Sequence, residues 1–224
     1  MFKPALSGFS KWLTYLGLAV ILSACHSKYE GKTVEQWIDL LETGNSIDKA
    51  QAVAALGKLG PKAEAAVPAL IKTLTGKDIK EKMLVSHALG KIGKAAVPAL
   101  VDVLKNEDEW IPVDTTFVIS EDWEEGQTSN ESVTWVNVYS EVSSALRIIG
   151  KDAVPALIEL LKHERKAVRK IAALTLGELG PAAGTAMQAL VESLDDEDEQ
   201  VRESAAYALS KIDSAGHSLK FDKQ

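Results

Sequence analysis

Apolar residues recur at helical spacing through most of the chain, in segments about a dozen residues long. Five segments share one design, in which apolar residues lie three or four positions apart with small residues between them. They are AQAVAALGKLG (50–60), MLVSHALGKIG (83–93), NVYSEVSSALRIIG (137–150), VRKIAALTLGELG (168–180) and VRESAAYALSKID (201–213). Four of the five end in glycine, which tolerates the left-handed backbone that closes a helix. The pattern predicts five amphipathic helices with sharp ends.

A second motif follows four of these segments. AVPAL occurs at 66–70, 96–100 and 153–157, and a related AMQAL occurs at 186–190. Proline suits the first turn of a helix, because its missing amide hydrogen would have no partner there. Each unit is therefore predicted to be a helix, a tight turn and a second helix, in about 30 residues. Because so short a pair cannot bury its apolar face alone, we expect the units to stack.

These repeats resemble HEAT repeats, in particular the short bacterial type named after phycobilisome lyases. The helix start of that family is matched by Val168–Arg169 and Val201–Arg202. Lysine replaces the arginine at Lys49 and Lys82, and the third unit departs from the pattern with Tyr139. The resemblance covers residues 34–213. It implies an all-α fold, an α–α superhelix or solenoid of about five repeats.

The ends of the array need a covering element. TVEQWIDLLETG (33–44) begins with Thr33 and Gln36, which have the spacing of a capping box. Its apolar stripe, which includes Trp37, predicts a helix that covers the first repeat. Residues 214–224 are predicted to be a solvated tail.

The repeat breaks step once. The three AVPAL motifs and the related AMQAL are 30, 57 and 33 residues apart in turn, and the long step contains an insertion at 107–137. Within it, TTFVIS (115–120) and SVTWVNVY (132–139) are rich in β-branched and aromatic residues that alternate with polar ones. We expect a β-hairpin-like insertion that projects from the solenoid, with helix resuming near Val138.

The insertion also differs in charge. Residues 106–146 contain ten acidic residues and no lysine or arginine, and three of the five tryptophans lie here. Exposed tryptophan beside carboxylates would suit a protein or peptide partner that carries basic residues. The candidate binding residues are Trp110, Trp123, Trp135, Glu121, Asp122, Glu124 and Glu125. The alternative is that the tryptophans pack the hairpin onto neighbouring helices and the acids only keep it soluble.

The N-terminus has the form of an export signal. Lys3 and Lys11 precede an apolar run at 12–24, which is too short as a helix to span a hydrocarbon core of about 30 Å. The run ends in LSAC, which resembles the lipobox of bacterial lipoproteins. The resemblance implies a signal peptide at 1–24, cleavage between Ala24 and Cys25, and acylation of Cys25, for example with palmitate. The alternative is an ordinary secretory signal with an unrelated cysteine.

Location follows from this resemblance. It implies a lipid-anchored tether at 25–33 and a place in the bacterial cell envelope. His26 stands where an aspartate would favour inner-membrane retention in many Gram-negative bacteria. If the organism is Gram-negative, we therefore expect the outer membrane.

Composition and motifs give no catalytic or metal site. The chain is 46% hydrophobic with a net charge of −7, which gives no hint of a nucleic-acid partner. A calcium loop aligned on Gly126 would place Trp123 at a ligand position. The HEAT-type di-iron oxygenase needs four His-Glu pairs, whereas only His163–Glu164 is present, and His87 is predicted to face outward. We read DDEDE (195–199) as a solvated turn and helix cap, and expect no cofactor.

These features predict a membrane-anchored, non-catalytic scaffold that mediates protein–protein interaction in the envelope. A structural accessory subunit of a membrane complex, with the insertion as a plug, stays open as an alternative. An enzyme of the HEAT type, such as a lyase or di-iron oxygenase, is the third alternative.

Overall fold

Helices make up nearly all of the described chain, as the sequence predicts. The computed structural model describes residues 28–76, 82–106, 110–113 and 134–213, with backbone alone for 110–113 and 134–137. The helices are α2 (Val34–Thr43), α3 (Ser46–Leu59), α4 (Val67–Thr75), α5 (Lys82–Ile92), α6 (Val97–Asn106), α7 (Val138–Ile149), α8 (Val154–Leu160), α9 (Lys166–Leu179), α10 (Met187–Glu192) and α11 (Glu199–Asp213). In these described ranges, no helix is both long and apolar enough to cross a membrane.

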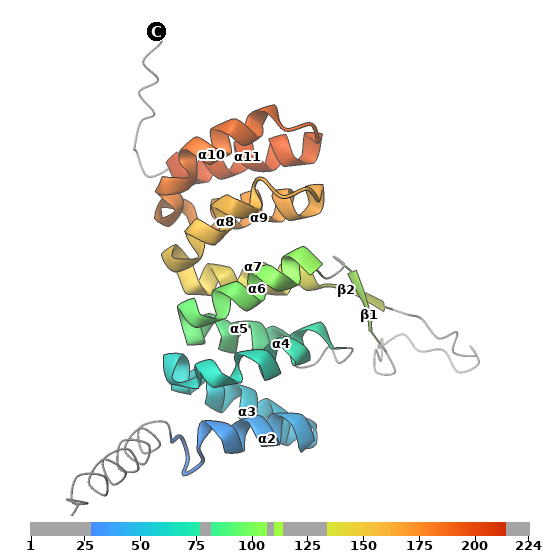
Figure 1. Ribbon diagram of the computed structural model, residues 1–224, viewed down its shortest axis with the longest axis vertical. Coiled ribbons are helices and arrows are strands. Elements are labelled where there is room, and N and C mark those ends of the chain that lie inside the picture. The colour runs from blue at the N-terminus through green and yellow to red at the C-terminus, as the bar shows by residue number, and fades with distance from the viewer. Residues whose placement is uncertain (1–27, 77–81, 107–109, 114–133, 214–224) are drawn as a thin grey trace, which may run out of the picture.

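The helices stack as pairs along one long axis (Figure 1). By contact, the pairs are α2 with α3, α4 with α5, α6 with α7, α8 with α9, and α10 with α11. The sequence pattern had instead joined each helix to the AVPAL helix that follows it. We call the members of a pair its first and second helix.

The predicted end cap is therefore the first helix of an ordinary pair. The capping box at Thr33 is present, with the Thr33 amide donating to Gln36 Oε1 at 2.9 Å. Trp37 of α2 corresponds in position to Leu70 of α4, since each lies three residues after a buried valine, and both side chains are buried. The stack thus begins with the same packing unit that continues it.

Glycine closes each second helix except the last. Four glycines that follow second helices have positive φ, namely Gly60 (58°), Gly93 (85°), Gly150 (79°) and Gly180 (57°). The chain then turns through a short 3₁₀ helix: η1 (Gly60–Ala66), η2 (Gly93–Ala96), η3 (Gly150–Ala153) or η4 (Gly180–Ala186). A further one, η5 (Ser193–Asp195), follows α10. Proline lies in the first turn of α4 and α8, which confirms the predicted helix starts.

A basic side chain ties the two helices of a pair together. Backbone carbonyls at the end of a helix and in the turn after it need donors from outside that helix. In three pairs the second helix supplies a cation to such carbonyls, at the end of α4 or in the turns that follow α8 and α10. The bonds are Lys82 Nζ to the Leu74 and Gly76 carbonyls (both 2.6 Å), Arg169 Nη1 to the His163 and Glu164 carbonyls (3.0 and 2.9 Å), and Arg202 Nη1 to the Asp196 and Glu197 carbonyls (2.8 and 3.1 Å).

The acidic run before α11 holds a buried ion pair. Arg169 donates through Nε and Nη2 to the two carboxylate oxygens of Asp196, both at 2.8 Å, and the side chains are 8% and 11% exposed. Asp198 accepts from the Gln200 amide at 3.0 Å and so caps α11. The predicted cap is confirmed, but the prediction of a wholly solvated turn is wrong, because the sequence did not reveal that Arg169 reaches Asp196.

Small residues set the distance between successive second helices. A side chain at Gly57 would meet Ala88 at 3.2 Å, and one at Gly177 would meet Ala208 at 2.9 Å. Gly90 is closer still, since a Cβ there would lie 2.6 Å from Ile148 Cβ. Glycine therefore lets neighbouring pairs approach until their helices touch.

The N-terminal segment folds back onto the first pair. Residues 29–32 form a tight turn, in which the Tyr29 and Lys32 backbones exchange hydrogen bonds of 3.0 and 3.1 Å. Trp37 Nε1 donates to the Tyr29 carbonyl at 3.2 Å, and Lys58 Nζ donates to Tyr29 Oη at 2.7 Å. From Tyr29 onward, the segment predicted as a tether is thus in contact with the solenoid.

We expect Gly90→Ala to destabilise the fold. Overpacking a close helix contact costs roughly 1–3 kcal/mol, which only partly cancels against the ~1 kcal/mol by which alanine favours a helix. Chemical unfolding followed by circular dichroism would measure a net loss of about 1 kcal/mol. Gly184→Ala is the control, because a Cβ there meets nothing within 4 Å. Equal effects of the two changes would contradict the close-approach argument.

The Arg169–Asp196 pair predicts a pH dependence of stability. The hydrogen bonds from Arg169 lower the pKa of Asp196 below its ordinary value. A carboxyl with a lowered pKa stabilises the fold at neutral pH, and this contribution is lost as pH falls below about 4 and through the folded pKa. Asp196→Asn should therefore reduce the free energy of unfolding by about 2 kcal/mol at pH 7, and by progressively less as the pH falls below about 4.

Urea unfolding at a series of pH values would measure this. Asp102→Asn, on the exposed face of α6, is the matched control and should be nearly neutral throughout. A loss for Asp196→Asn that is the same at pH 7 and pH 3 would show that the carboxylate charge is not what stabilises the pair.

Candidate functional site

The third pair, α6 with α7, carries the insertion in the loop between its two helices. Two short strands, β1 (Trp110–Val113) and β2 (Thr134–Asn137), pair antiparallel at the base of this loop (Figure 1). Trp110 lies opposite Asn137, and Pro112 lies opposite Trp135. Positions two apart on a strand share a face, so Trp110 and Trp135 lie at diagonal positions on one face of the ladder. Two of the three candidate tryptophans are thereby brought together.

The strand positions differ in part from the sequence prediction. β2 overlaps the second predicted strand, and α7 begins at Val138. β1 was not predicted as a strand, and the stretch that was, 115–120, lies outside the described residues. Outside them also lie Ala24, Cys25, Glu121, Asp122, Trp123, Glu124 and Glu125.

The third pair is tied together differently from the others. Tyr139 of α7 is buried and donates through Oη to the Leu104 carbonyl at 2.9 Å. The next carbonyl, that of Lys105, accepts from Arg165 Nη1 at 3.1 Å. Arg165 lies just before α9, so the fourth pair supplies the cation that α7 lacks. These two bonds fix the end of α6, from which the insertion departs.

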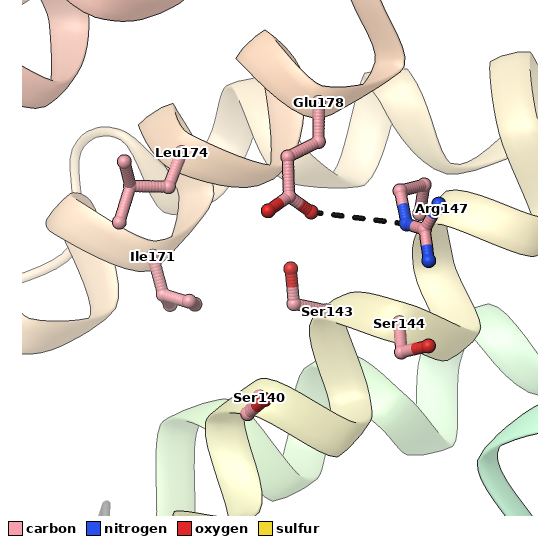
Figure 2. A pocket seen from close by; sticks show the side chains of 7 residues that line it. All are labelled: Ser140, Ser143, Ser144, Arg147, Ile171, Leu174 and Glu178. Atoms are coloured by element: carbon pink, nitrogen blue, oxygen red, sulfur yellow. Dashed lines mark ion pairs between the residues drawn. The ribbon is translucent and has the colours of Figure 1, made fainter. Parts of the chain in front are cut away.

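A groove lies between α7 and α9, the second helices of the third and fourth pairs (Figure 2). α9 packs much more closely against α11 than against α7. The resulting cavity has a volume of about 530 Å³. Its lining residues are Ser140, Ser143, Ser144 and Arg147 of α7 and Ile171, Leu174 and Glu178 of α9.

Two hydroxyl groups join the helices at the floor of the groove. Ser143 Oγ lies 2.7 Å from Thr175 Oγ1, and both residues are buried. Thr175 Oγ1 is also 2.7 Å from the Ile171 carbonyl, to which it donates. Because the Thr175 hydroxyl donates its one hydrogen to that carbonyl, it can only accept from Ser143, so Ser143 is the donor in this bond. The polar groups beneath the groove are therefore paired.

One ion pair crosses the rim. Arg147 Nε lies 3.9 Å from Glu178 Oε2, and the side chains are 52% and 46% exposed. Arg147 occupies the repeat position of Gly57, Gly90 and Gly177. A glycine there would allow α7 to approach α9 as the other second helices approach each other. The arginine explains why this junction stays open.

The histidines do not form a metal site in the described part of the chain. His87 is exposed on α5, as predicted. The backbone carbonyls of His163 and Glu164 instead accept hydrogen bonds from Arg169. His163 Nδ1 accepts from the Arg165 amide at 3.2 Å. Within the described ranges, no three His, Cys, Asp or Glu residues gather so that they could hold a metal ion.

Comparison with known families identifies the repeats. A family model described as HEAT repeats matches residues 34–113 and 137–210, more than half of the chain. The chain is a HEAT-repeat protein. The match breaks off over residues 114–136, within the insertion. No curated protein sequence matches this HEAT-repeat protein.

Several solved structures are similar to the HEAT-repeat protein. An engineered protein shares 23% identity with a TM-score of 0.37, covering 87% of this chain and 88% of that one. A designed armadillo repeat protein in complex with peptide (KR)4 shares 16% identity with a TM-score of 0.37, covering 89% and 94%. The complex of CpcE and CpcF of phycocyanin lyase from Nostoc sp. PCC7120 shares 26% identity with a TM-score of 0.36, covering 88% and 72%. Similarities this loose carry no argument about ligands or chemistry.

The groove was not predicted, although the sequence holds its signal. Arg147 interrupts the row of glycines, and Glu178 stands where Lys58, Lys91 and Lys211 stand on α3, α5 and α11 and where Ile148 stands on α7. Read as departures from the repeat, these two residues mark the junction of the third and fourth pairs. Arg165 carries no such signal, because it lies in a loop and its partner is 60 residues away.

We expect Tyr139→Phe to loosen the base of the insertion. The change leaves the Leu104 carbonyl without its side-chain donor, which should cost about 1 kcal/mol in chemical unfolding. Hydrogen exchange at the amides of residues 110, 111 and 113 should also accelerate, since β1 begins four residues after the last residue of α6. Tyr207→Phe is the matched control, because Tyr207 is 43% exposed. Unchanged exchange at 110–113 would mean that Tyr139 does not position the strands.

Proposed function

We propose that this HEAT-repeat protein is a lipid-anchored, non-catalytic scaffold of the bacterial cell envelope. It binds a protein partner at the third pair of the stack. The observation that carries the proposal is the placement of the insertion: an acidic, tryptophan-bearing segment enters and leaves the array through one antiparallel strand pair beside α7. Insertions in solenoids map to loops and often to the binding face.

The anchor is proposed from the lipobox at Cys25. Tyr29 is held by Trp37 and Lys58, so only four residue steps separate it from the acylated cysteine. These steps reach at most about 14 Å. The first pair then lies next to the bilayer, and later pairs extend from it. With His26 after the cysteine, the outer membrane is the destination we propose for a Gram-negative cell.

The partner is proposed to be a protein segment that carries basic residues. Tryptophan is favoured in binding hot spots because its large ring is buried at little cost in conformational entropy. The carboxylates of residues 106–146 would speed association with a positively charged partner. Trp110 and Trp135 hold diagonal positions on one face of the strand pair, where this surface would begin.

The alternative is an accessory subunit in which the insertion only plugs a gap. β1 does contact α7, as a plug would. The two roles differ in stability: loss of a plug destabilises the fold, whereas loss of a recognition element spares it.

The test is crosslinking in intact membranes followed by capture of the tagged protein. One variant replaces residues 114–133 with Asn-Gly, a two-residue turn that suits an antiparallel pair and leaves β1 and β2 intact. It removes Trp123 and six of the ten carboxylates of residues 106–146. We expect recovery of the partner to fall about tenfold or more, with an unchanged melting temperature.

Cys25→Ser serves as the anchoring arm of the same experiment. It should abolish incorporation of labelled palmitate and release the protein from the membrane fraction, while the folded repeats keep their melting temperature. Equal partner recovery with and without residues 114–133 would overturn the binding proposal. A lower melting temperature on their removal would favour the plug.

A further inference from the structure

The turns between successive pairs form one edge of the stack. η1, η2, η3 and η4 contact one another in succession, and a Cβ on Gly60 would lie 3.4 Å from the Lys91 carbonyl oxygen. The N-terminal segment reaches the same edge, because Lys58 in the last turn of α3 donates to the Tyr29 hydroxyl at 2.7 Å. β1 and β2 leave the stack at the opposite edge (Figure 1). We call these four turns, the helix ends that meet them and residues 28–33 the turn edge.

Charge is distributed unevenly along the turn edge. Among the described residues, the first two pairs hold six lysines and three carboxylates there, an excess of three positive charges. They are Lys28, Lys32, Lys58, Lys62, Lys91 and Lys94 against Glu30, Glu35 and Glu64. Over the other three pairs, three cations face three carboxylates, namely Arg147, Lys151 and Lys211 against Asp152, Glu178 and Asp213. The basic excess is therefore confined to the part of the edge nearest the N-terminus.

The six lysines of this basic part are exposed, and their charges are available to a ligand. In the described ranges, none of them forms an ion pair with an acidic side chain. Lysines near the opposite edge do form such pairs, at 3.8 Å between Lys72 and Glu42 and at 3.4 Å between Lys162 and Glu192. The basic part of the turn edge thus lacks the carboxylate partners that neutralise lysines elsewhere.

A lipid anchor at Cys25 would attach beside this basic part. Four residue steps separate Cys25 from Tyr29, a reach of at most about 14 Å, and Tyr29 is bonded to Lys58. Anionic headgroups attract exposed lysines that lie within a Debye length of roughly 8–10 Å. A basic patch next to an acyl chain gives a second attachment to the same surface. Charge and position therefore both favour an anionic lipid surface as the ligand.

We propose that the basic part of the turn edge lies on anionic lipid headgroups, so that the first two pairs lie along the bilayer. The inference rests on the proposed function in one respect, the lipid anchor at Cys25. It adds an orientation to that anchor. β1 and β2 lie at the opposite edge and therefore point away from the lipid, where the insertion can reach a partner protein.

The test uses the acylated protein added to preformed vesicles of phosphatidylcholine, with or without about 30% phosphatidylglycerol. Lipid blocks the Cys25 sulfur, so a thiol introduced by Ala65→Cys in η1 is the one that reacts with a neutral polyethylene-glycol maleimide. Ala65 is exposed on the turn edge, and Ser46→Cys, at the exposed start of α3, is the matched control on the opposite edge. Ala65→Cys should react about tenfold more slowly on the anionic vesicles, whereas Ser46→Cys should react equally on both.

Lysine variants in the Ala65→Cys background identify the cause. About 0.5 M salt should bring the rates on the two vesicles within about twofold, because it screens the lysines. Removing three lysines of the basic part should do the same: Lys62→Gln, Lys91→Gln and Lys94→Gln. The matched control removes equal charge near the opposite edge and should keep the tenfold difference: Lys72→Gln, Lys105→Gln and Lys162→Gln.

The inference is overturned if Ala65→Cys in the acylated protein reacts equally on both vesicles, or if the two triple variants behave alike. Either result leaves the anchor and the partner of the proposed function untouched. Absence of labelled palmitate on Cys25 would instead remove the anchor, and this inference would fall with it. If no partner is captured while Ala65→Cys is protected on anionic vesicles, partner binding fails and the orientation stands.

Discussion

The backbone carbonyls at the turn between the two helices of a pair must find donors, and the way they find them ties the pair together. An unsatisfied carbonyl at a packed junction is costly, so a donor must come from nearby. Lys82, Arg169 and Arg202 each supply it from the second helix of the same pair. This bond joins the second helix to the turn before it and makes the pair a unit. At α4 the Lys82 cation also interacts favourably with the helix dipole, which a neutral donor would not do.

The spacing between neighbouring pairs depends on a different requirement: a glycine where successive second helices touch. Gly57, Gly90 and Gly177 let second helices touch, and the apolar residues around them are then buried. The details still vary: Gly90 meets Ile148, whereas Gly57 and Gly177 meet alanines one helical turn earlier in the repeat. The contact between α5 and α7 is thus shifted by one helical turn relative to the other close contacts. On its other side, α7 is held apart from α9. Both irregularities lie in the helix that follows the insertion.

Much of the fold could be predicted from the sequence, because its local signals agree with one another. Apolar spacing, closing glycines and first-turn prolines locate helices, and the Thr33 capping box marks the first. Helix pairing could not be deduced in this way, since periodicity says which face is buried but not which neighbour covers it. Asp196 was taken as solvated for the same reason: its partner Arg169 lies 27 residues away. The groove depends on a residue that is too large for its repeat position, which only comparison among the repeats reveals.

The coincidence of insertion and groove has a physical reason. In a solenoid each unit contacts only its neighbours, so a change at one junction need not propagate to the ends. A long loop inside the third pair carries the chain away between α6 and α7, and the α6 end then takes a neutral donor from Tyr139 and a cation from Arg165 of the next pair. The bond from Arg165 thus joins the third and fourth pairs through the end of α6. Between α7 and α9, by contrast, Arg147 keeps the two second helices apart. The bond from Arg165 to the Lys105 carbonyl holds the third and fourth pairs together, while the groove between α7 and α9 leaves side chains accessible. This junction can therefore present a surface without weakening the stack.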